Sequence, residues 1–434
     1  MQEIKDSGIE WVRKIPIGWK VARLKDVIQM LTDYTANGSF GDLAKNVQYL
    51  DYEDYARLIR LTDLRENLEN SGVYVSEYSY DYLEKSSLYG GEILVANVGA
   101  YAGLFCEMPP INMPSTLGPN MFLIRTNSKM IQHYLYYLGN ADFVWKQLVQ
   151  KAMSSAQPKL NKTDVKTTYI IVPPLQEQHR IAAFLDAKCA EIDALTADIQ
   201  TQIDTLEQYK RSVITETVTK GLNPNAEMKD SGIEWVGEIP VHWPVHPVYS
   251  YYGERKNKNR LGKEDNLLSL SYGRVIRKDI NTNDGLLPES FNTYNIVEAG
   301  DIIIRPTDLQ NDKRSLRTGL VKEHGIITSA YIDLCPLKQV DSRYFHFLLH
   351  AYDVMKVFYN MGNGVRQGLN YSEFSRLMVF EPPYEEQVAM ADYLETKVTE
   401  VDAIIEQKKE QMAVLDAYKR SLIFEYVTGK KEVI

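Results

Sequence analysis

Residues 173–195 read PPLQEQHRIAAFLDAKCAEIDAL, and residues 382–404 read PPYEEQVAMADYLETKVTEVDAI. The two stretches continue without a gap to a YKRS tetrapeptide, at Tyr209 and Tyr418. After the Pro-Pro pair, each copy runs for about 45 residues without glycine or proline, the residues that break helices. At ~1.5 Å per residue, each copy predicts one helix some 60–70 Å long. Proline and acidic side chains suit the first turn of such a helix.

A heptad pattern of apolar residues runs along both predicted helices. We expect one seam position to hold Leu185, Ile192, Ile199, Leu206 and Val213 in the first copy, and Leu394, Val401, Leu415 and Leu422 in the second. We assign the other seam position to Leu195, Tyr209, Ile404 and Tyr418, with polar residues between them. A seam this long needs a partner helix, and the other repeat is the obvious candidate. The pattern alone leaves parallel and antiparallel pairing open.

A second repeated segment lies far upstream of each predicted helix. Residues 5–19 read KDSGIEWVRKIPIGW and residues 229–243 read KDSGIEWVGEIPVHW, with eleven of the fifteen positions identical. The chain therefore alternates repeated segments with two stretches that differ, 20–172 and 244–381, which we call the fillings. We divide it into two globular domains, 1–172 and 223–381, each followed by a long helical segment, 173–222 and 382–434.

The two fillings follow the same order of predicted elements. Strands are predicted at 91–99, 267–276 and 300–308, and aromatic-rich helices at 129–153 and 342–362. In each filling a Gly-Glu/Asp-Ile strand precedes the helix, and a polar turn and a last strand lead into Pro-Pro. The expected fold class is therefore α+β: two divergent mixed α/β domains within an internal two-fold repeat.

The charge is unevenly distributed along the chain. The net charge is −9, but the helical segments 173–219 and 382–428 carry eight acids against four bases and ten against five. The fillings are close to neutral, so the overall charge does not exclude a nucleic-acid partner. With three scattered cysteines, no apolar run of about 20 residues and no signal-peptide pattern, the expected location is the cytoplasm.

Catalytic and metal-binding patterns are weak. No glycine-rich phosphate loop occurs. Glu381-Pro-Pro-Tyr384 resembles the motif of amino-methyltransferases, but the first copy reads Val172-Pro-Pro-Leu175, so we interpret both as helix starts. His346 and His350 lack the glutamate of a zinc-peptidase helix and are interpreted as packing residues. We predict no catalytic residue and no metal site on this chain.

The fillings carry recognition chemistry instead. Arginine with asparagine or glutamine can read guanine and adenine edges, while lysine and serine position phosphates. We predict DNA contacts from polar turns, basic clusters and neighbouring strands in both fillings. The predicted residues are Asn97, Ser154, Ser155, Gln157, Lys159 and Asn161 in the first, and Lys256, Lys258, Arg260, Tyr272, Arg274, Arg305, Lys313, Arg314, Arg317, Arg366, Gln367, Asn370 and Tyr371 in the second.

In their repeated order, these motifs resemble one family, the specificity subunit of type I restriction-modification enzymes. The resemblance spans the chain and rests on Trp-x-x-x-Ile-Pro-x-x-Trp at 11–19 and 235–243, the Gly-Glu/Asp-Ile strand, the Leu-Asn pair of the polar turn, and Pro-Pro-x-x-Glu-Gln. Each motif is weak alone, but the twofold order is specific.

The resemblance implies two target recognition domains, each reading half of a bipartite DNA site. The helices would form an antiparallel coiled coil that acts as a ruler for the gap. Two methyltransferase subunits and two restriction/translocase subunits would be the partners, and S-adenosylmethionine, ATP and magnesium would bind to them rather than to this chain.

Two other functions are considered beside this one. The chain could be a coiled-coil scaffold joining two protein-binding modules without DNA, or a stand-alone DNA adenine methyltransferase acting through Glu381-Pro-Pro-Tyr384.

Overall fold

The computed structural model describes residues 3–153, 157–281, 290–307, 309, 316–361 and 368–433. The chain divides into two compact units, one made of Met1–Asp198 with Glu410–Ile434 and the other of Ile199–Lys409. Each unit therefore contains one filling and a part of both long helices, α7 (Leu175–Lys220) and α10 (Tyr384–Val427). Among the residues described, no helix is both long and apolar enough to cross a membrane.

The first unit is built on a four-stranded sheet of order β4-β11-β8-β9, in which all neighbours are antiparallel. A second four-stranded sheet has the order β6-β5-β10-β7, and the described residues of the other unit contain no counterpart of it. The strands of the first unit are β1 (Ile4–Asp6), β2 (Lys14–Pro16), β3 (Lys20–Arg23), β4 (Ile28–Asp33), β5 (Ala56–Ile59), β6 (Tyr74–Val75), β7 (Ser87–Leu88), β8 (Ile93–Ala96), β9 (Phe105–Glu107), β10 (Ser115–Leu117), β11 (Met121–Thr126) and β12 (Tyr169–Val172). Its shorter helices are α1 (Phe40–Asn46), α2 (Leu61–Arg65), α3 (Glu77–Tyr82), α4 (Gln132–Gly139), α5 (Asp142–Ala152) and α6 (Lys162–Lys166), with 3₁₀ turns at Leu24–Asp26, Tyr34–Asn37 and Glu84–Ser86.

The second unit repeats the first sheet with the order β16-β23-β20-β21, again antiparallel throughout. In addition, its described residues form two antiparallel pairs, the hairpin β17-β18 and the pair β19-β22, whose strands are distant in sequence. Its strands are β13 (Met228–Asp230), β14 (Glu238–Pro240), β15 (Val245–Pro247), β16 (Tyr252–Glu254), β17 (Leu268–Ser271), β18 (Arg274–Arg277), β19 (Asn295–Val297), β20 (Ile302–Ile304), β21 (Thr318–Leu320), β22 (Gly325–Ile327), β23 (Ile332–Pro336) and β24 (Met378–Phe380). Its shorter helices are α8 (Ser342–Val354) and α9 (Tyr371–Phe374), with 3₁₀ turns at Val248–Ser250 and Val357–Asn360.

The remaining strand pairs also match between the units. β1-β2 and β13-β14 are hairpins in the repeated segments, and β3-β12 and β15-β24 join the start of each filling to its last strand. The predicted α+β class and internal repeat are therefore confirmed. Three predicted elements are wrong in detail. The helix expected at 342–362 ends at Val354 and is followed by a separate 3₁₀ turn at Val357–Asn360. The helix expected at 129–153 is two helices, because Asn140 and Ala141 end α4, and the strand expected at 267–276 is the hairpin β17-β18, turning at Tyr272-Gly273 with φ of 48° and 77°.

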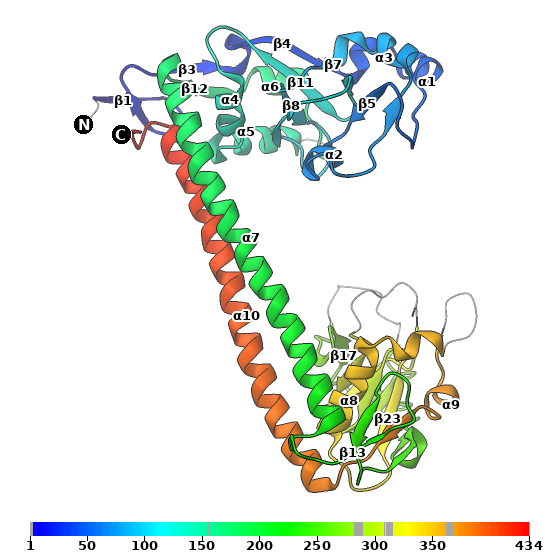
Figure 1. Cartoon of the computed structure of the whole chain (residues 1–434). Helices are drawn as coiled ribbons and strands as arrows, with labels where there is room; N and C mark the ends of the chain where they lie inside the picture. The colour runs from blue at the N-terminus through cyan, green and yellow to red at the C-terminus, as the bar shows by residue number, and fades with distance from the viewer. Residues whose placement is uncertain are drawn as a thin grey trace. The chain divides into compact units, whose positions relative to one another are not determined.

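The two long helices are confirmed and run in opposite directions within each unit (Figure 1). In the first unit the rings of Phe184 and Tyr426 lie 4.4 Å apart, and further along α7 the carboxylate of Asp193 lies 2.6 Å from the ammonium of Lys419. In the second unit Lys210 pairs with Asp402 at 2.7 Å. The second ion pair is the repeat counterpart of the first, with the helices exchanged.

The predicted seam is half correct. Its first position is buried or half-buried at every predicted residue, from Leu185 to Leu422. The second position is wrong, because Leu195, Tyr209, Ile404 and Tyr418 are 52%, 50%, 42% and 51% exposed. The side chains that pack there lie one residue further along each helix: Cys189, Thr196, Ile203, Lys210 and Thr217, and Val398, Ile405, Met412, Lys419 and Tyr426. The seam lysines are those of the two interhelix ion pairs.

Candidate nucleic-acid interface

The repeated tryptophans anchor the globular part of each unit to the start of the long helix that follows it in sequence. The indole nitrogen of Trp19 donates to the carboxylate of Glu177, and that of Trp243 donates to Glu386 at 3.0 Å. Both rings are buried. The two repeated segments, far apart in sequence, therefore meet in the same place in both units, and this contact is structural.

The glutamine of Pro-Pro-x-x-Glu-Gln has a similar role. Gln178 accepts from the backbone N–H of Ile131 at 2.9 Å, and Gln387 accepts from that of Asp341 at 2.9 Å. Each amide also donates to the carbonyl of the first proline, Pro173 or Pro382. Because both glutamines are buried, these bonds fix the loop before α4 or α8 on the long helix.

The buried acid of the Gly-Glu/Asp-Ile strand holds the preceding turn and an arginine. Glu92 accepts from the N–H groups of Tyr89 and Gly90 and pairs with Arg125 at 3.1 Å. Asp301 accepts from the N–H of Glu298 and pairs with Arg255 at 2.7 Å. The motif is shared because the turn needs the carboxylate, although the arginine comes from a different part of each unit.

The polar turn is held beside the end of the central strand in both units. The N–H of Leu160 donates to the carbonyl of Asn97 at 2.8 Å, and that of Leu369 donates to the carbonyl of Pro306 at 2.9 Å. The leucines are buried, and the following asparagines cap α6 and α9 with their side-chain oxygens. The site that these bonds define, polar turn against strand end, is the candidate interface in each unit.

In the first unit the structure brings three predicted residues together at this site. Asn97 directly follows β8, and its side-chain oxygen is buried without a hydrogen-bond partner among the described residues. Gln157 and Lys159 are exposed on the polar turn, and Val98 forms a bridge with Lys159. Asn161 lies there too, but its oxygen accepts from the N–H groups of Thr163 and Asp164, so it is a helix cap rather than a free base reader.

In the second unit Lys256, Arg260, Tyr272, Arg274, Arg305 and Asn370 are the exposed residues among those predicted and described. Arg305 follows β20 and adjoins the polar turn, and Tyr272 is 72% exposed at the turn of the β17-β18 hairpin. Predicted residues Ser154, Ser155, Lys313, Arg314, Arg366 and Gln367 lie outside the described residues.

Several predicted contacts are occupied by contacts within the protein. The prediction for Arg317 is wrong, because this side chain is 1% exposed and donates to the carbonyls of Arg305 and Thr307. Other side chains have partners inside the unit: Arg274 pairs with Asp402 at 2.7 Å, Lys258 donates to the carbonyl of Thr293, Asn370 caps α9, and the hydroxyl of Tyr371 donates to the carbonyl of Tyr252. Base readout and local structure draw on the same residue types, so composition alone did not separate them.

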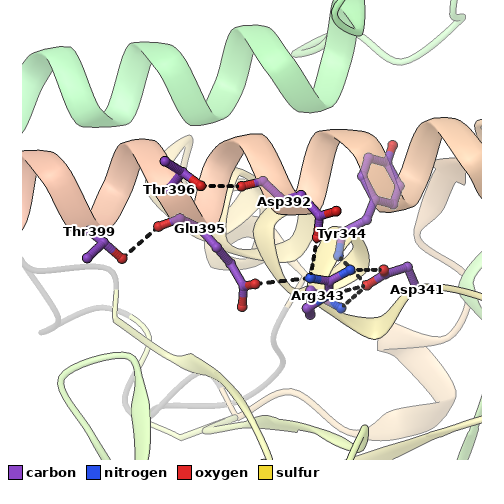
Figure 2. Close-up of polar contacts among 7 residues, drawn as sticks. All are labelled: Asp341, Arg343, Tyr344, Asp392, Glu395, Thr396 and Thr399. Carbon is purple, nitrogen blue, oxygen red and sulfur yellow. Dashed lines mark hydrogen bonds and ion pairs between the residues drawn. The ribbon is translucent and has the colours of Figure 1, made fainter.

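The sequence did not predict a cluster of ion pairs that joins the globular part of each unit to a long helix. In the second unit Arg343, at the start of α8, contacts Asp341 and the two α10 carboxylates Asp392 and Glu395, as Figure 2 shows. In the first unit His133, in α4, lies between Glu107 and Asp186. The available signal was positional, because each residue precedes a tyrosine, Tyr134 or Tyr344, at the same place in its helix.

The described residues contain no cluster of histidine, cysteine, aspartate or glutamate suited to a metal ion. Burial lowers the pKa of His346 to about 3 and that of His350 to about 4, so both are neutral packing residues at ordinary pH. The carboxylate of Glu381 pairs with Lys338 at 2.9 Å, and Tyr384 is the first residue of α10. These contacts agree with the interpretation of Pro-Pro as a helix start.

Known proteins resemble the chain over nearly its whole length. Residues 16–205 match the family described as Type I restriction modification DNA specificity domain. The chain is 25% identical to the putative type I restriction enzyme MjaX specificity subunit of Methanocaldococcus jannaschii, over 97% of this chain and 96% of that protein. It is 23% identical to the type I restriction enzyme MjaVIII specificity subunit of the same organism, over 100% and 98%. A chain from a solved structure described as the structural basis underlying complex assembly and conformational transition of the type I R-M system has the same fold, with a TM-score of 0.70 and 16% identity, covering 96% of this chain and 99% of that one.

Proposed function

The chain is a specificity subunit of a type I restriction-modification system, and from this premise we propose that it reads a bipartite DNA target with one recognition domain per half-site. One observation carries the proposal. Both units have the same central sheet and the same bond between polar turn and strand end, yet different strands and loops are inserted around them. A frame that is repeated in both units, with different insertions in each, suits two domains that read different sequences.

We further propose that α7 and α10 set the gap between the half-sites. Each helix continues for more than 40 residues without a break, and the two pair in antiparallel fashion in each unit. Half-sites read from one face of the duplex have centres about one helical turn, ~34–36 Å, apart. A continuous helix of ~1.5 Å rise per residue can keep such a spacing fixed, which a flexible linker could not do.

The proposed division of labour places the chemistry on partner subunits. We expect two methyltransferase subunits and two restriction/translocase subunits to assemble with this chain and to bind S-adenosylmethionine, ATP and magnesium. Within this chain, the repeated Glu-Gln and tryptophan contacts would position the recognition domains and perform no reaction. Purified alone, the chain should transfer no methyl group to DNA.

The gap length gives the sharpest test. Insertion of one heptad after Thr201 and another after Glu410 extends both helices at equivalent places between the two interhelix ion pairs. Seven residues add ~10 Å to a helix, which corresponds to about three base pairs. Methylome sequencing of a host with the cognate methyltransferase should return the same two half-sites with a longer gap.

The control is the same insertion in one helix only, which mismatches the seam and should weaken assembly. An unchanged gap with intact methylation in the double insertion would refute the ruler. If the chain were a protein scaffold without DNA, no footprint would form even with the methyltransferase present. A stand-alone methyltransferase would instead show activity without partners.

A further inference from the structure

The helices α4 and α8 dock on the long helices through equivalent residues. The hydroxyl of Tyr134 donates to the carbonyl of Val427 at 3.4 Å, and the hydroxyl of Tyr344 donates to the carbonyl of Val218 at 3.2 Å. Val218 and Val427 are themselves repeat counterparts near the ends of α7 and α10. His133 and Arg343, one residue before each tyrosine, therefore stand at the same place in their units.

Arg343 joins its recognition unit to α10 by several charged hydrogen bonds. One terminal nitrogen donates to Asp392 at 2.6 Å and to Glu395 at 3.0 Å, and the other to Asp341 at 2.6 Å (Figure 2). Asp341 also caps the start of α8. The guanidinium keeps its charge at any ordinary pH, so this joint does not depend on proton concentration.

His133 makes the corresponding joint in the first unit. Its Nδ1 lies 2.5 Å from a carboxylate oxygen of Glu107 on β9, and its Nε2 lies 2.7 Å from Asp186 on α7. Asp186 is the repeat counterpart of Glu395. The ring thus bridges the central sheet of the recognition unit to its long helix, as Arg343 does for α8 and α10.

The geometry requires two protons on the ring. A neutral imidazole has one N–H donor, and its other nitrogen would face a carboxylate lone pair without a proton between them. Only the imidazolium can donate to Glu107 and Asp186 at once. Loss of one proton therefore removes one of the two bonds and the attraction between the ring and both acids.

We propose that His133 and Arg343 are equivalent positioning residues that fasten each recognition domain to its long helix, and that the histidine makes the first attachment depend on protonation while the second is permanent. The inference rests on the proposed function, because a change in the attachment is observed as a change in recognition of one half-site. Its consequence is an asymmetric response: raising the pH loosens the first reader and leaves the second in place.

The surroundings of His133 keep it in exchange with solvent. From its own helix it is faced by the rings of Tyr136 and Tyr137, and the hydroxyl of Tyr137 donates to the same Asp186 oxygen at 2.6 Å. Asp186 and both tyrosines line a cavity of about 240 Å³, whose other charged or titratable residues are Cys189 and Asp193 of α7 and Lys419 of α10. The histidine side chain is itself 37% exposed.

The direction of titration follows from the same contacts. Burial disfavours the charged ring, but the hydrogen bonds with Glu107 and Asp186 outweigh it and raise the pKa of His133 above its ordinary value of 6.5. A raised pKa means that the attachment is complete below the ordinary value and is lost as the pH rises through the raised one. The sensitive range therefore begins near neutrality and extends above it.

A reciprocal exchange tests the proposal in the assembled methyltransferase complex. Methylation rates are measured from pH 6 to pH 9 on the cognate duplex and on duplexes with one base pair substituted in the first or in the second half-site. For the natural complex, discrimination at the first half-site should fall by about two- to fivefold over this range, as expected for a partly exposed ion pair. Discrimination at the second half-site should stay constant.

The variants His133→Arg and Arg343→His exchange the two chemistries. His133→Arg should make first-half-site discrimination independent of pH, and Arg343→His should transfer the pH dependence to the second half-site. His133→Gln, which cannot become charged, should show the reduced discrimination at every pH. A purely structural role would lower stability and total activity without moving the pH dependence from one half-site to the other.

The outcomes distinguish a failure of the proposed function from a failure of the fastening role alone. If the natural complex does not discriminate at either half-site at pH 6, the proposed function itself fails. If it discriminates at both half-sites with the same pH profile in all variants, only the fastening role is overturned. NMR titration of His133 in the full-length chain gives an independent readout, and a midpoint at or below 6.5 would overturn the proposal.

Discussion

Arg317 and Asn161 show how a base-reading composition can serve local structure instead. Arg317 is buried and donates to two backbone carbonyls, and Asn161 caps α6 together with the carboxylate of Asp164. The asparagine role was readable, because Asn-x-x-Asp and its counterpart Asn370-x-x-Glu are capping-box spacings. The burial of Arg317 was not, because it depends on the strands that surround it.

We predict opposite effects for two arginines of the second unit. Arg317→Met leaves the carbonyls of Arg305 and Thr307 without their donor, and should cost roughly 2–4 kcal/mol in the free energy of unfolding. Arg260→Ala, at an exposed site, should leave stability unchanged and reduce the salt dependence of DNA binding by about one phosphate contact. Thermal melting and binding at several salt concentrations measure both. An unchanged salt dependence in Arg260→Ala would remove it from the interface.

Asp333 is a buried carboxyl at a position where the first unit has a leucine. It pairs in the sheet with Ile303, as Leu123 pairs with Leu94, and neither carboxylate oxygen accepts a hydrogen bond among the described residues. Burial, with the nearby charge of Asp301, raises its pKa to about 8. The folded state therefore keeps a proton that the unfolded state, with an ordinary pKa of 3.8, releases.

This shift predicts that Asp333 destabilises the second unit as the pH rises from about 4 to about 8. Asp333→Asn should remove that dependence and raise the free energy of unfolding at pH 8 by roughly 1–3 kcal/mol, with no gain near pH 4. Denaturant unfolding at both values measures the difference. A gain of equal size at pH 4 would show that titration is not its cause.

The long helices were predictable as elements, but their packing faces were not. A heptad alternates steps of three and four residues, so Leu185 can stand before either step. The large side chains of Leu195 and Tyr209 favoured a step of three, whereas the structure uses a step of four and buries Ile203. Two lysines on the true seam obscured it, because their pairing with Asp193 and Asp402 cannot be read from one helix.

Two adjacent isoleucines in α10 test this seam. Ile405 is 3% exposed and Ile404 is 42% exposed, so the same substitution samples the buried and the open face. Ile405→Ala should cost roughly 2–4 kcal/mol, whereas Ile404→Ala should cost less than about 0.5 kcal/mol. Denaturant unfolding of the full chain measures both. Equal losses would contradict the seam, and a larger loss for Ile404 would restore the one predicted from the heptads.

At the scale of the molecule, the repeat predicted two similar domains, and the shared sheet order confirms this. The inserted strands could not be predicted, because their pairing depends on contacts between distant residues. One further property of the repeat shows only in the structure. Each unit is completed by the final part of the long helix that belongs to the other half of the sequence, as Leu422 and Val427 of α10 show in the core of the first unit.

Because the first unit includes the end of α10, we can predict how a fragment without α10 behaves. A fragment of residues 1–222 lacks Leu422 and Val427 but carries their counterparts, Val213 and Val218, at the unpaired end of α7. Two copies can exchange these ends, since a two-fold dimer lets each patch meet its equivalent in the other copy. We expect a dimer by sedimentation analysis, which Val218→Asp should dissociate because it would bury an unpaired charge.

The half-chain dimer should also recognise a different DNA target from the full chain. With two identical recognition domains, its complex with the methyltransferase should modify a symmetric target in which the first half-site occurs twice in inverted orientation. The full chain, with two different units, should ignore that target. A stable folded monomer of the half-chain would show that the first unit does not need the distant helix end, and a dimer that keeps the asymmetric target would contradict one reader per half-site.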